Sequence, residues 1–476
     1  MIFTSFEFII LLIITLACYW IFAKYRRVQN LLIVIASYIF YGWWDWRFLS
    51  LMFASTTLDY FIGLGLAGAH VERKRKFLLW TSIIAQLSLL GFFKYFNFFI
   101  SSITTLASSL GIPSHSLITL NIILPVGISF YTFQTMSYTI DVYRRKVEPT
   151  RDFIAFAAFV SFFPQLVAGP IERASHLLGQ FLKDRSFSYA LAGDGVKQII
   201  WGFFKKIVIA DNLGTVVAQI YANSTNASGW ELLGATLFFA FQIYTDFSAY
   251  SDIAIGTARL FGFDIMRNFN YPYFSKNIIQ FWQRWHISLS TWFRDYVYIP
   301  LGGSRATTAQ YLRNIIVVFL LSGLWHGANW TFVIWGALHG LAFLPLAITK
   351  NRDRYRTSKV VEPEFRDLHK IIGTFVFVLF TWVFFRAQSV QESLFILKKI
   401  FSTIFSSLPN STQLYPAWLL GLALFIAFEW IQRQRPHALD VGDWPSWAKV
   451  FPYYGMVVIT LLFGSFSSAP FIYFQF

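Results

Sequence analysis

The residues with the clearest potential for chemistry lie in a long apolar stretch between Arg313 and Lys350. No Asp, Glu, Lys or Arg occurs between these two positions, and His326 lies near the middle, in the segment 323–330, which reads GLWHGANW. Imidazole exchanges a proton near neutral pH, and an ionisable side chain deep in an apolar segment usually has a function. His326 is therefore a candidate proton carrier, although a neutral histidine that hydrogen-bonds between helices would suit the position equally well.

This stretch is too long for one transmembrane helix. As a single helix it would be about 54 Å long, whereas the hydrocarbon core of a bilayer is about 30 Å thick. The glycines, Asn329 and the tryptophans predict a break at residues 327–330. Counted from Arg313, His326 lies about 20 Å along an untilted helix, which places its imidazole near the middle of the membrane.

Two pairs of glycines follow a four-residue spacing on either side of the expected break. They are Gly323 with Gly327 and Gly336 with Gly340, and the second pair encloses another histidine, His339. Small residues at this spacing allow helix backbones to approach closely in a membrane. We therefore expect tight helix packing around His326.

A second candidate histidine occurs in an aromatic segment rich in basic residues. Residues 281–296 read FWQRWHISLSTWFRDY and contain His286. Several large side chains share one face at helical spacing, which predicts an amphipathic helix against the inner leaflet. These are Trp282, Trp285, His286, Leu289, Trp292, Phe293 and Tyr296. The tryptophans are expected to anchor the helix at the interface, and His286 taken alone could be a hydrogen-bonded packing residue.

Two carboxylates lie inside the apolar segment 231–259. Asp246 and Asp252 are the only charged residues between Glu231 and Arg259, so they need partners inside the membrane. The simpler expectation is that they hydrogen-bond neighbouring helices or hold an arginine. Alternatively, Asp246 and Tyr250, which are four residues apart on one helical face, line a substrate path.

The composition excludes an ordinary soluble protein. Of the 476 residues, 56% are hydrophobic, 20% are aromatic and only 13% are charged. The net charge of +15 comes from short basic clusters between apolar runs, a distribution typical of cytoplasmic loops rather than of nucleic-acid binding. With Cys18 as the single cysteine, the chain has no disulfide framework and no thiol metal site.

The basic clusters at 24–27 and 70–76 are expected inside, which places the N-terminus outside. We expect about ten or eleven crossings and two or three partial ones, in one integral membrane domain over residues 1–476. Within it, residues 1–150 form N-terminal helices, residues 151–348 form a core with re-entrant segments, and residues 349–476 form C-terminal helices.

Three segments are less regular. A span is expected near 117–140, and Lys94 marks either a loop between two spans or a point within one longer path. The segment 152–170 ends in a run with two prolines and a glycine, which makes it a poor full crossing. A re-entrant helix is the alternative there.

Several ordered motifs together resemble the membrane-bound O-acyltransferase family. They are 281–290 (FWQRWHISLS), 301–303 (LGG), 323–328 (GLWHGA), 382–387 (WVFFRA), 167–171 (VAGPI) and 244–248 (YTDFS). The resemblance covers nearly the whole chain and is closest to the branch that O-acetylates alginate and other bacterial polysaccharides. The D-alanine exporter of teichoic acids is similar at a greater distance.

The resemblance implies an all-α polytopic membrane fold, with a ring of helices around a thin central region and a funnel on each side. His326 matches the most consistent histidine of the family, and the second catalytic position falls on His286. Their neighbours are expected to contact substrate or line the tunnel. These residues are Asp246, Tyr250, Trp285, Trp325 and Asn329.

Acyl transfer from a thioester to a hydroxyl needs a base for the hydroxyl proton and electrostatic help for the oxyanion. We expect His326 to act as the general base and His286 to orient it or to polarise the thioester carbonyl. No Gly-x-Ser-x-Gly turn occurs, and a covalent acyl-enzyme stays open as an alternative. We assign no metal, because two histidines fall short of the three or four ligands that zinc prefers.

No permanently bound cofactor is expected, and the donor would be acetyl-CoA or an acyl-carrier thioester, attracted to a basic inner face. In the resembling systems a separate periplasmic acetyltransferase takes the group onward, so we expect such a partner. The polysaccharide acceptor would be reached directly or through it. Lipids of the bacterial inner membrane are the surroundings, and no nucleic acid is involved.

Two other classes of protein are compatible with parts of this pattern. Polar residues at mid-membrane and broken helices also occur in secondary transporters, although no internal repeat supports one here. An exporter of D-alanyl or other acyl groups for cell-envelope polymers is a related alternative. A purely structural subunit of an export complex would tolerate the loss of both histidines.

Overall fold

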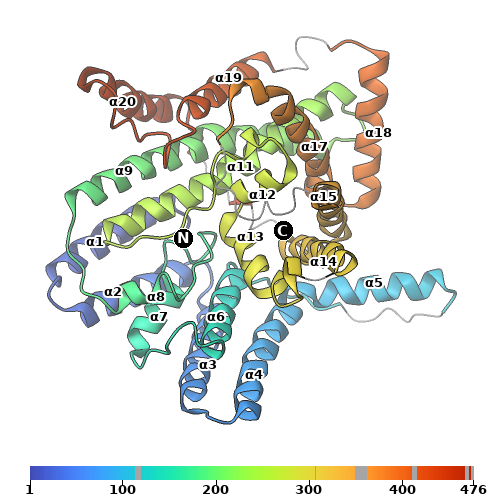
Figure 1. Ribbon diagram of the computed structural model, residues 1–476. Coiled ribbons are helices and arrows are strands. Elements are labelled where there is room, and N and C mark those ends of the chain that lie inside the picture. The colour runs from blue at the N-terminus through green and yellow to red at the C-terminus, as the bar shows by residue number, and fades with distance from the viewer. Residues whose placement is uncertain (113–118, 306, 349–361, 410–414, 467–470, 473–476) are drawn as a thin grey trace. The chain divides into compact units, whose positions relative to one another are not determined.

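The computed structural model describes residues 1–112, 119–305, 307–348, 362–409, 415–466 and 471–472 (Figure 1). All regular elements within these ranges are helices. Five of them are long and apolar enough to cross a membrane, and four shorter helices are also apolar. The expected all-α polytopic membrane fold is therefore confirmed, whereas the number of crossings stays a prediction.

The described chain forms two compact units. One consists of Met1–Ala192 with Ala258–Ile265, and the other of Gly193–Thr257 with Met266–Phe476. The second unit contains both candidate histidines and every predicted site residue. The expected organisation as one acyltransferase domain stays a prediction.

The described part of the first unit contains the first eight α-helices of the chain. They are α1 (Phe6–Ile21), α2 (Arg26–Gly42), α3 (Leu49–Gly68), α4 (Glu72–Leu90), α5 (Phe96–Ser109), α6 (Ile128–Tyr143), α7 (Phe153–Ser161) and α8 (Leu178–Phe181). A π-helical turn, Gly91–Tyr95, joins α4 to α5. The chain therefore passes Lys94 within one continuous helical path and forms no loop there.

Of two predictions for this unit, one gave the wrong boundary and the other is confirmed. The span near 117–140 was placed too early, because α6 begins only at Ile128, after Pro125 and a left-handed Gly127 (φ 75°). Residues 113–118 lie outside the described part. In the segment 152–170, α7 has only nine residues and is about 13 Å long, so it is too short to cross a bilayer, as predicted.

The second unit contains most of α9 and nearly all later helices. They are α9 (Tyr189–Phe203), α10 (Asp211–Ala222), α11 (Gly229–Leu260), α12 (Ile278–Arg284), α13 (Ile287–Phe293), α14 (Thr308–His326), α15 (Trp330–Ile348), α17 (Leu368–Arg386), α18 (Val390–Ser406), α19 (Pro416–Ile431) and α20 (Ser446–Phe463). A π-helical segment, Phe204–Ala210, joins α9 to α10.

The predicted break in the long apolar stretch is confirmed. Helix α14 ends at His326, α15 begins at Trp330, and the two helices pack side by side as a hairpin (Figure 1). A Cβ atom on Gly323 would lie 2.3 Å from the carbonyl oxygen of Phe332, and one on Gly336 would lie 2.3 Å from that of Phe319. The two backbones are therefore in contact at these glycines, as the glycine spacing predicts.

The prediction of one amphipathic helix over 281–296 was wrong. Helices α12 and α13 have seven residues each and are separated at Trp285 and His286, where His286 is left-handed (φ 43°, ψ 55°). The tryptophans are also not interfacial anchors, because Trp282, Trp285 and Trp292 are 8%, 0% and 4% exposed. Helical periodicity reports a shared face, but it does not show whether lipid or protein covers that face.

The glycine contact between α14 and α15 predicts a clear difference between glycine variants. Gly323→Ala and Gly336→Ala should each destabilise the folded state by about 1–3 kcal/mol, because the new methyl group meets backbone atoms. The control is Gly373→Ala in α17, where the methyl group meets open space. That variant should be neutral or stabilising, since alanine favours a helix over glycine by about 1 kcal/mol. Thermal denaturation of the detergent-purified variants checks this, and equal midpoints for Gly323→Ala and Gly373→Ala would contradict it.

Candidate active site

The structure brings the two predicted histidines together. His326 is the last residue of α14, and His286 occupies the turn between α12 and α13. Their ring centroids are 6.3 Å apart, although 40 positions separate them in the chain. Both side chains are buried, with 2% of His326 and none of His286 exposed. The fold therefore brings the two imidazoles into one buried cluster.

Aromatic rings enclose this histidine pair. The ring of His326 lies 5.1 Å from Trp335 and 5.3 Å from Phe385, and Trp325 contacts both histidines. The ring of Phe247 on α11 lies 4.6 Å from His286. Such a wall excludes water and strengthens electrostatic interactions at the pair. Burial also lowers the pKa of His286, which keeps its imidazole neutral.

The histidines of this unit differ in how their ring nitrogens are satisfied. His339 is hydrogen-bonded at both ring nitrogens: Nδ1 accepts from the indole N–H of Trp282 at 3.3 Å, and Nε2 bonds the hydroxyl of Thr381 at 3.0 Å. Within the described residues, neither ring nitrogen of His286 has a hydrogen-bond partner. His339 therefore fits a structural role, whereas His286 does not fit the alternative of a hydrogen-bonded packing residue.

A cavity of about 480 Å³ lies in the same unit, lined by residues close in sequence to both histidines but by neither histidine itself. It is lined mainly by apolar side chains of α12 to α15 and the turns after α13, with a few polar groups such as Ser290 and Arg294. Two of the lining residues are close to the histidines along the chain. Ser322 lies one helical turn before His326, and Ile287 directly follows His286. This size and lining suit an elongated and largely apolar substrate arm.

The carboxylate of Asp246 is paired inside the protein. It lies 3.0 Å from the ammonium of Lys206, which also contacts Asp211 at 2.7 Å. Its second oxygen accepts a hydrogen bond of 2.8 Å from the backbone N–H of Ile472. The simpler expectation, that this carboxylate has partners in neighbouring segments, is therefore confirmed, with a lysine in place of the suggested arginine.

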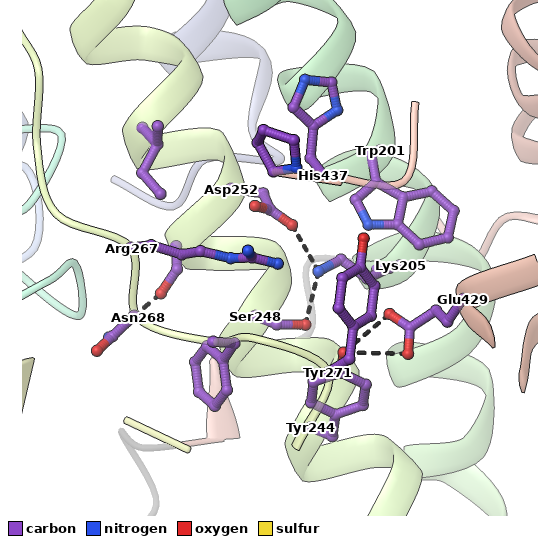
Figure 2. A pocket seen from close by; sticks show the side chains of 14 residues that line it. Trp201, Lys205, Tyr244, Ser248, Asp252, Arg267, Asn268, Tyr271, Glu429 and His437 are labelled. Carbon is purple, nitrogen blue, oxygen red and sulfur yellow. Dashed lines mark hydrogen bonds and ion pairs between the residues drawn. The ribbon is translucent and has the colours of Figure 1, made fainter. Parts of the chain in front are cut away.

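Asp252 is paired in the same way beside a small polar pocket. Lys205 donates to Asp252 and to Ser248, each at 2.6 Å, and Tyr244 donates to Glu429 at 2.8 Å (Figure 2). The sequence shows these lysines only as bases at the start of a segment. The signal that could have predicted these pairs is the presence of two lysines and two aspartates in successive apolar segments, 40 and 47 positions apart.

The other predicted tunnel residues lie in different surroundings. Tyr250 is buried, with its ring 5.2 Å from Phe471, and Trp285 is fully buried, with its ring 5.2 Å from Trp382. Trp325 lies against the histidine pair, as described above. The side chain of Asn329 accepts from the N–H of Thr331 and donates to the carbonyl of Gln388, both at 3.0 Å, at the start of α15. Their roles in binding substrate stay predictions.

The described residues include no group of three or more His, Cys, Asp or Glu side chains arranged to hold a metal ion. The chemistry that this arrangement supports is proton transfer and polarisation by two buried imidazoles in an apolar enclosure.

Comparison with known proteins identifies the family to which this chain is similar. The family model "MBOAT, membrane-bound O-acyltransferase family" matches residues 35–391. A protein named "Probable alginate O-acetylase AlgI" from Azotobacter vinelandii is 44% identical over 367 residues, which cover 77% of this chain and 71% of that protein. A protein of the same name from Pseudomonas putida is 38% identical, with both chains fully covered. A "Peptidoglycan O-acetyltransferase" from Helicobacter pylori is 36% identical, covering 79% of this chain and 74% of that protein.

The matched range includes both histidines, the α14–α15 hairpin and all of α17. The matched range covers well over half of the chain. The three relatives, all more than 30% identical, are also named as O-acetylating enzymes. This multi-pass membrane protein therefore belongs to the membrane-bound O-acyltransferase family and is an O-acyltransferase.

Proposed function

We propose that this protein moves an acetyl group from a cytoplasmic thioester across the bacterial inner membrane, for O-acetylation of an extracytoplasmic polysaccharide such as alginate. The observation that carries the proposal is the buried pair of His286 and His326 at the end of a broken membrane helix. The names of the relatives support the polysaccharide acceptor.

His326 acts as the general base in this proposal. It takes the proton of the attacking hydroxyl as the oxygen bonds to the thioester carbonyl carbon, and the proton then goes to the departing thiolate. Positioned general-base catalysis contributes about 10² to 10⁴ in rate. The enclosure by Trp335 and Phe385 supports this role, because a neutral imidazole in apolar surroundings is ready to accept a proton.

His286 polarises the thioester carbonyl or orients His326. Its ring lies 6.3 Å from that of His326, close enough for both imidazoles to act on one bound thioester. An N–H donor aimed at the developing oxyanion is typically worth about 10² to 10³ in rate. Because no other described side chain satisfies its ring nitrogens, His286 can offer them to substrate.

The donor is acetyl-CoA or an acyl-carrier thioester, used as a substrate and not held as a resident cofactor. Both donors end in a flexible pantetheine arm, and the cavity of about 480 Å³ beside Ser322 has the size and lining for such an arm. The excess of 39 Lys and Arg over 24 Asp and Glu favours an anionic donor at the basic inner face.

The direction of the reaction follows from where its substrates occur. Thioester donors are cytoplasmic and the polysaccharide lies outside, so the acetyl group passes through the protein. The N-terminus lies outside in this topology, as the basic clusters at 24–27 and 70–76 indicate. A periplasmic acetyltransferase partner receives the group and transfers it to the polymer.

Replacing His326 tests its proposed role as the general base. We expect His326→Ala to abolish acetyl transfer while leaving the abundance of the protein unchanged, because the base is lost and the fold is kept. The measurement is the transfer of radiolabelled acetyl groups from acetyl-CoA in membranes, together with the amount of folded protein. Normal transfer by the variant would remove His326 from the mechanism.

The matched control is His339→Ala, another buried histidine of the same unit. Because His339 hydrogen-bonds Thr381 and Trp282, its loss should lower the yield of folded protein and leave the turnover of each folded molecule largely unchanged. A purely structural protein would instead tolerate both His286→Ala and His326→Ala without loss of polysaccharide O-acetylation.

A double-label experiment separates an acyltransferase from a transporter. Sealed inverted vesicles receive acetyl-CoA with one isotope in the acetyl group and another in the adenine. We expect the acetyl label to reach the vesicle lumen or its acceptor, while the adenine label stays outside. Entry of both labels in equal amounts would indicate transport of the intact donor and contradict the proposal. Replacing the acetyl donor with a D-alanyl thioester in the same assay tests the related exporter alternative.

A further inference from the structure

The backbone of His286 needs external support. Its φ of 43° and ψ of 55° are left-handed, a conformation that residues with a Cβ atom rarely adopt. Such conformations persist only where the surrounding structure holds them. The turn also follows one seven-residue helix and precedes another, and helices this short are not stable alone.

Asn268 provides three hydrogen bonds on the far side of this turn. Its carbonyl oxygen accepts from the N–H of Ile287 at 2.9 Å. Its side-chain oxygen accepts from the N–H of Ser288 at 3.2 Å and from the hydroxyl of the same serine at 2.9 Å. The first two residues of α13, directly after His286, are therefore held by one asparagine.

The side-chain amide nitrogen of Asn268 and the residues that follow it are also hydrogen-bonded. Its side-chain amide donates to the hydroxyl of Ser251 on α11 at 3.3 Å. Two positions later, the N–H of Asn270 donates to the carbonyl of Arg284 at 2.9 Å, and the Arg284 guanidinium donates to the carbonyl of Asn270 at 3.0 Å. The segment 268–270 thus binds the chain on both sides of the Trp285–His286 turn.

We propose that Asn268 is a positioning residue for His286, holding its left-handed turn so that the imidazole faces His326. The inference rests on the proposed function, because it gives His286 a place in acyl transfer. Asn268 is fully buried, and its amide oxygen accepts two hydrogen bonds from Ser288, so its removal deletes two hydrogen bonds in the protein interior. The turn then relaxes, and the ring of His286 moves.

A small movement of this ring has a large kinetic effect. Misplacement of a catalytic group by about 1 Å can lower the rate about 100-fold, whereas binding of the distant parts of the substrate is unchanged. We therefore expect Asn268→Ala to lower kcat for acetyl-CoA about 10- to 100-fold with little change in KM. A residue that only stabilises the fold would instead lower the amount of active protein and leave kcat per folded molecule unchanged.

The experiment measures release of CoA from acetyl-CoA by the purified protein, with an alginate oligosaccharide supplied as the hydroxyl acceptor and kcat calculated per folded molecule. Asn268→Asp keeps an acceptor oxygen and should restore most of the turnover lost in Asn268→Ala. Ser288→Ala should lower kcat severalfold, because one of the two donors remains. The double variant Asn268→Ala with Ser288→Ala should be no slower than Asn268→Ala alone, since both changes break the same contact.

Asn30→Ala is the matched control. Asn30 in α2 is also fully buried, and its side chain donates to the carbonyl of Phe181 at 2.9 Å within the first unit. Its loss should lower stability and leave kcat per folded molecule unchanged. His286→Ala is the reference for complete loss of the positioned group.

The outcomes test the positioning role of Asn268 separately from the proposed function. If His286→Ala is inactive and Asn268→Ala has the kcat of the wild type, the positioning role is overturned and the proposed function stands. If His286→Ala and His326→Ala both keep full activity, the proposed function fails. Should Asn268→Ala not fold, Ser288→Ala decides, because an unchanged kcat in that variant also overturns the positioning role.

Discussion

The contact between the backbones of α14 and α15 is the constraint on which the site depends. Gly323 and Gly336 allow the hairpin to close, and the closed hairpin places the last residue of α14, His326, among the rings of Trp335 and Phe385. Without close approach, α14 would end at a distance from these rings. In a membrane this contact is stabilised by packing, because lipid tails and helix surfaces are equally apolar.

The ionisable groups of the second unit are of two kinds. Lys205 and Lys206 are paired with carboxylates, so charges that would be costly in an apolar interior are compensated. His286 and His326 need no such pairing while they are neutral, and aromatic rings surround them. The charged side chains are therefore paired with each other, and the two imidazoles are the groups that can take up and release a proton during a reaction.

The helical fold, the break after His326 and the close approach of the glycines could all be predicted, because hydropathy and small-residue spacing are local properties of the sequence. The turn at His286 could not be predicted, since its left-handed backbone is held by Asn268, which lies 18 positions earlier, in an irregular segment. The burial of Trp282 was missed for a similar reason: an aromatic residue on an amphipathic face can meet lipid or protein, and tertiary packing decides between them. The start of α6 was missed because apolar character continues through the irregular residues before Gly127.

The central claim is that a thioester meets the two imidazoles. Electron cryomicroscopy of the purified protein with a non-hydrolysable acetyl-CoA analogue tests it most directly, because the position of the acyl carbonyl can be compared with both rings. We predict that this carbonyl lies between His286 and His326, within about 3.2 Å of a nitrogen of at least one ring. An analogue bound with its acyl end away from both histidines, while aromatic packing closes every passage to them, would contradict the account.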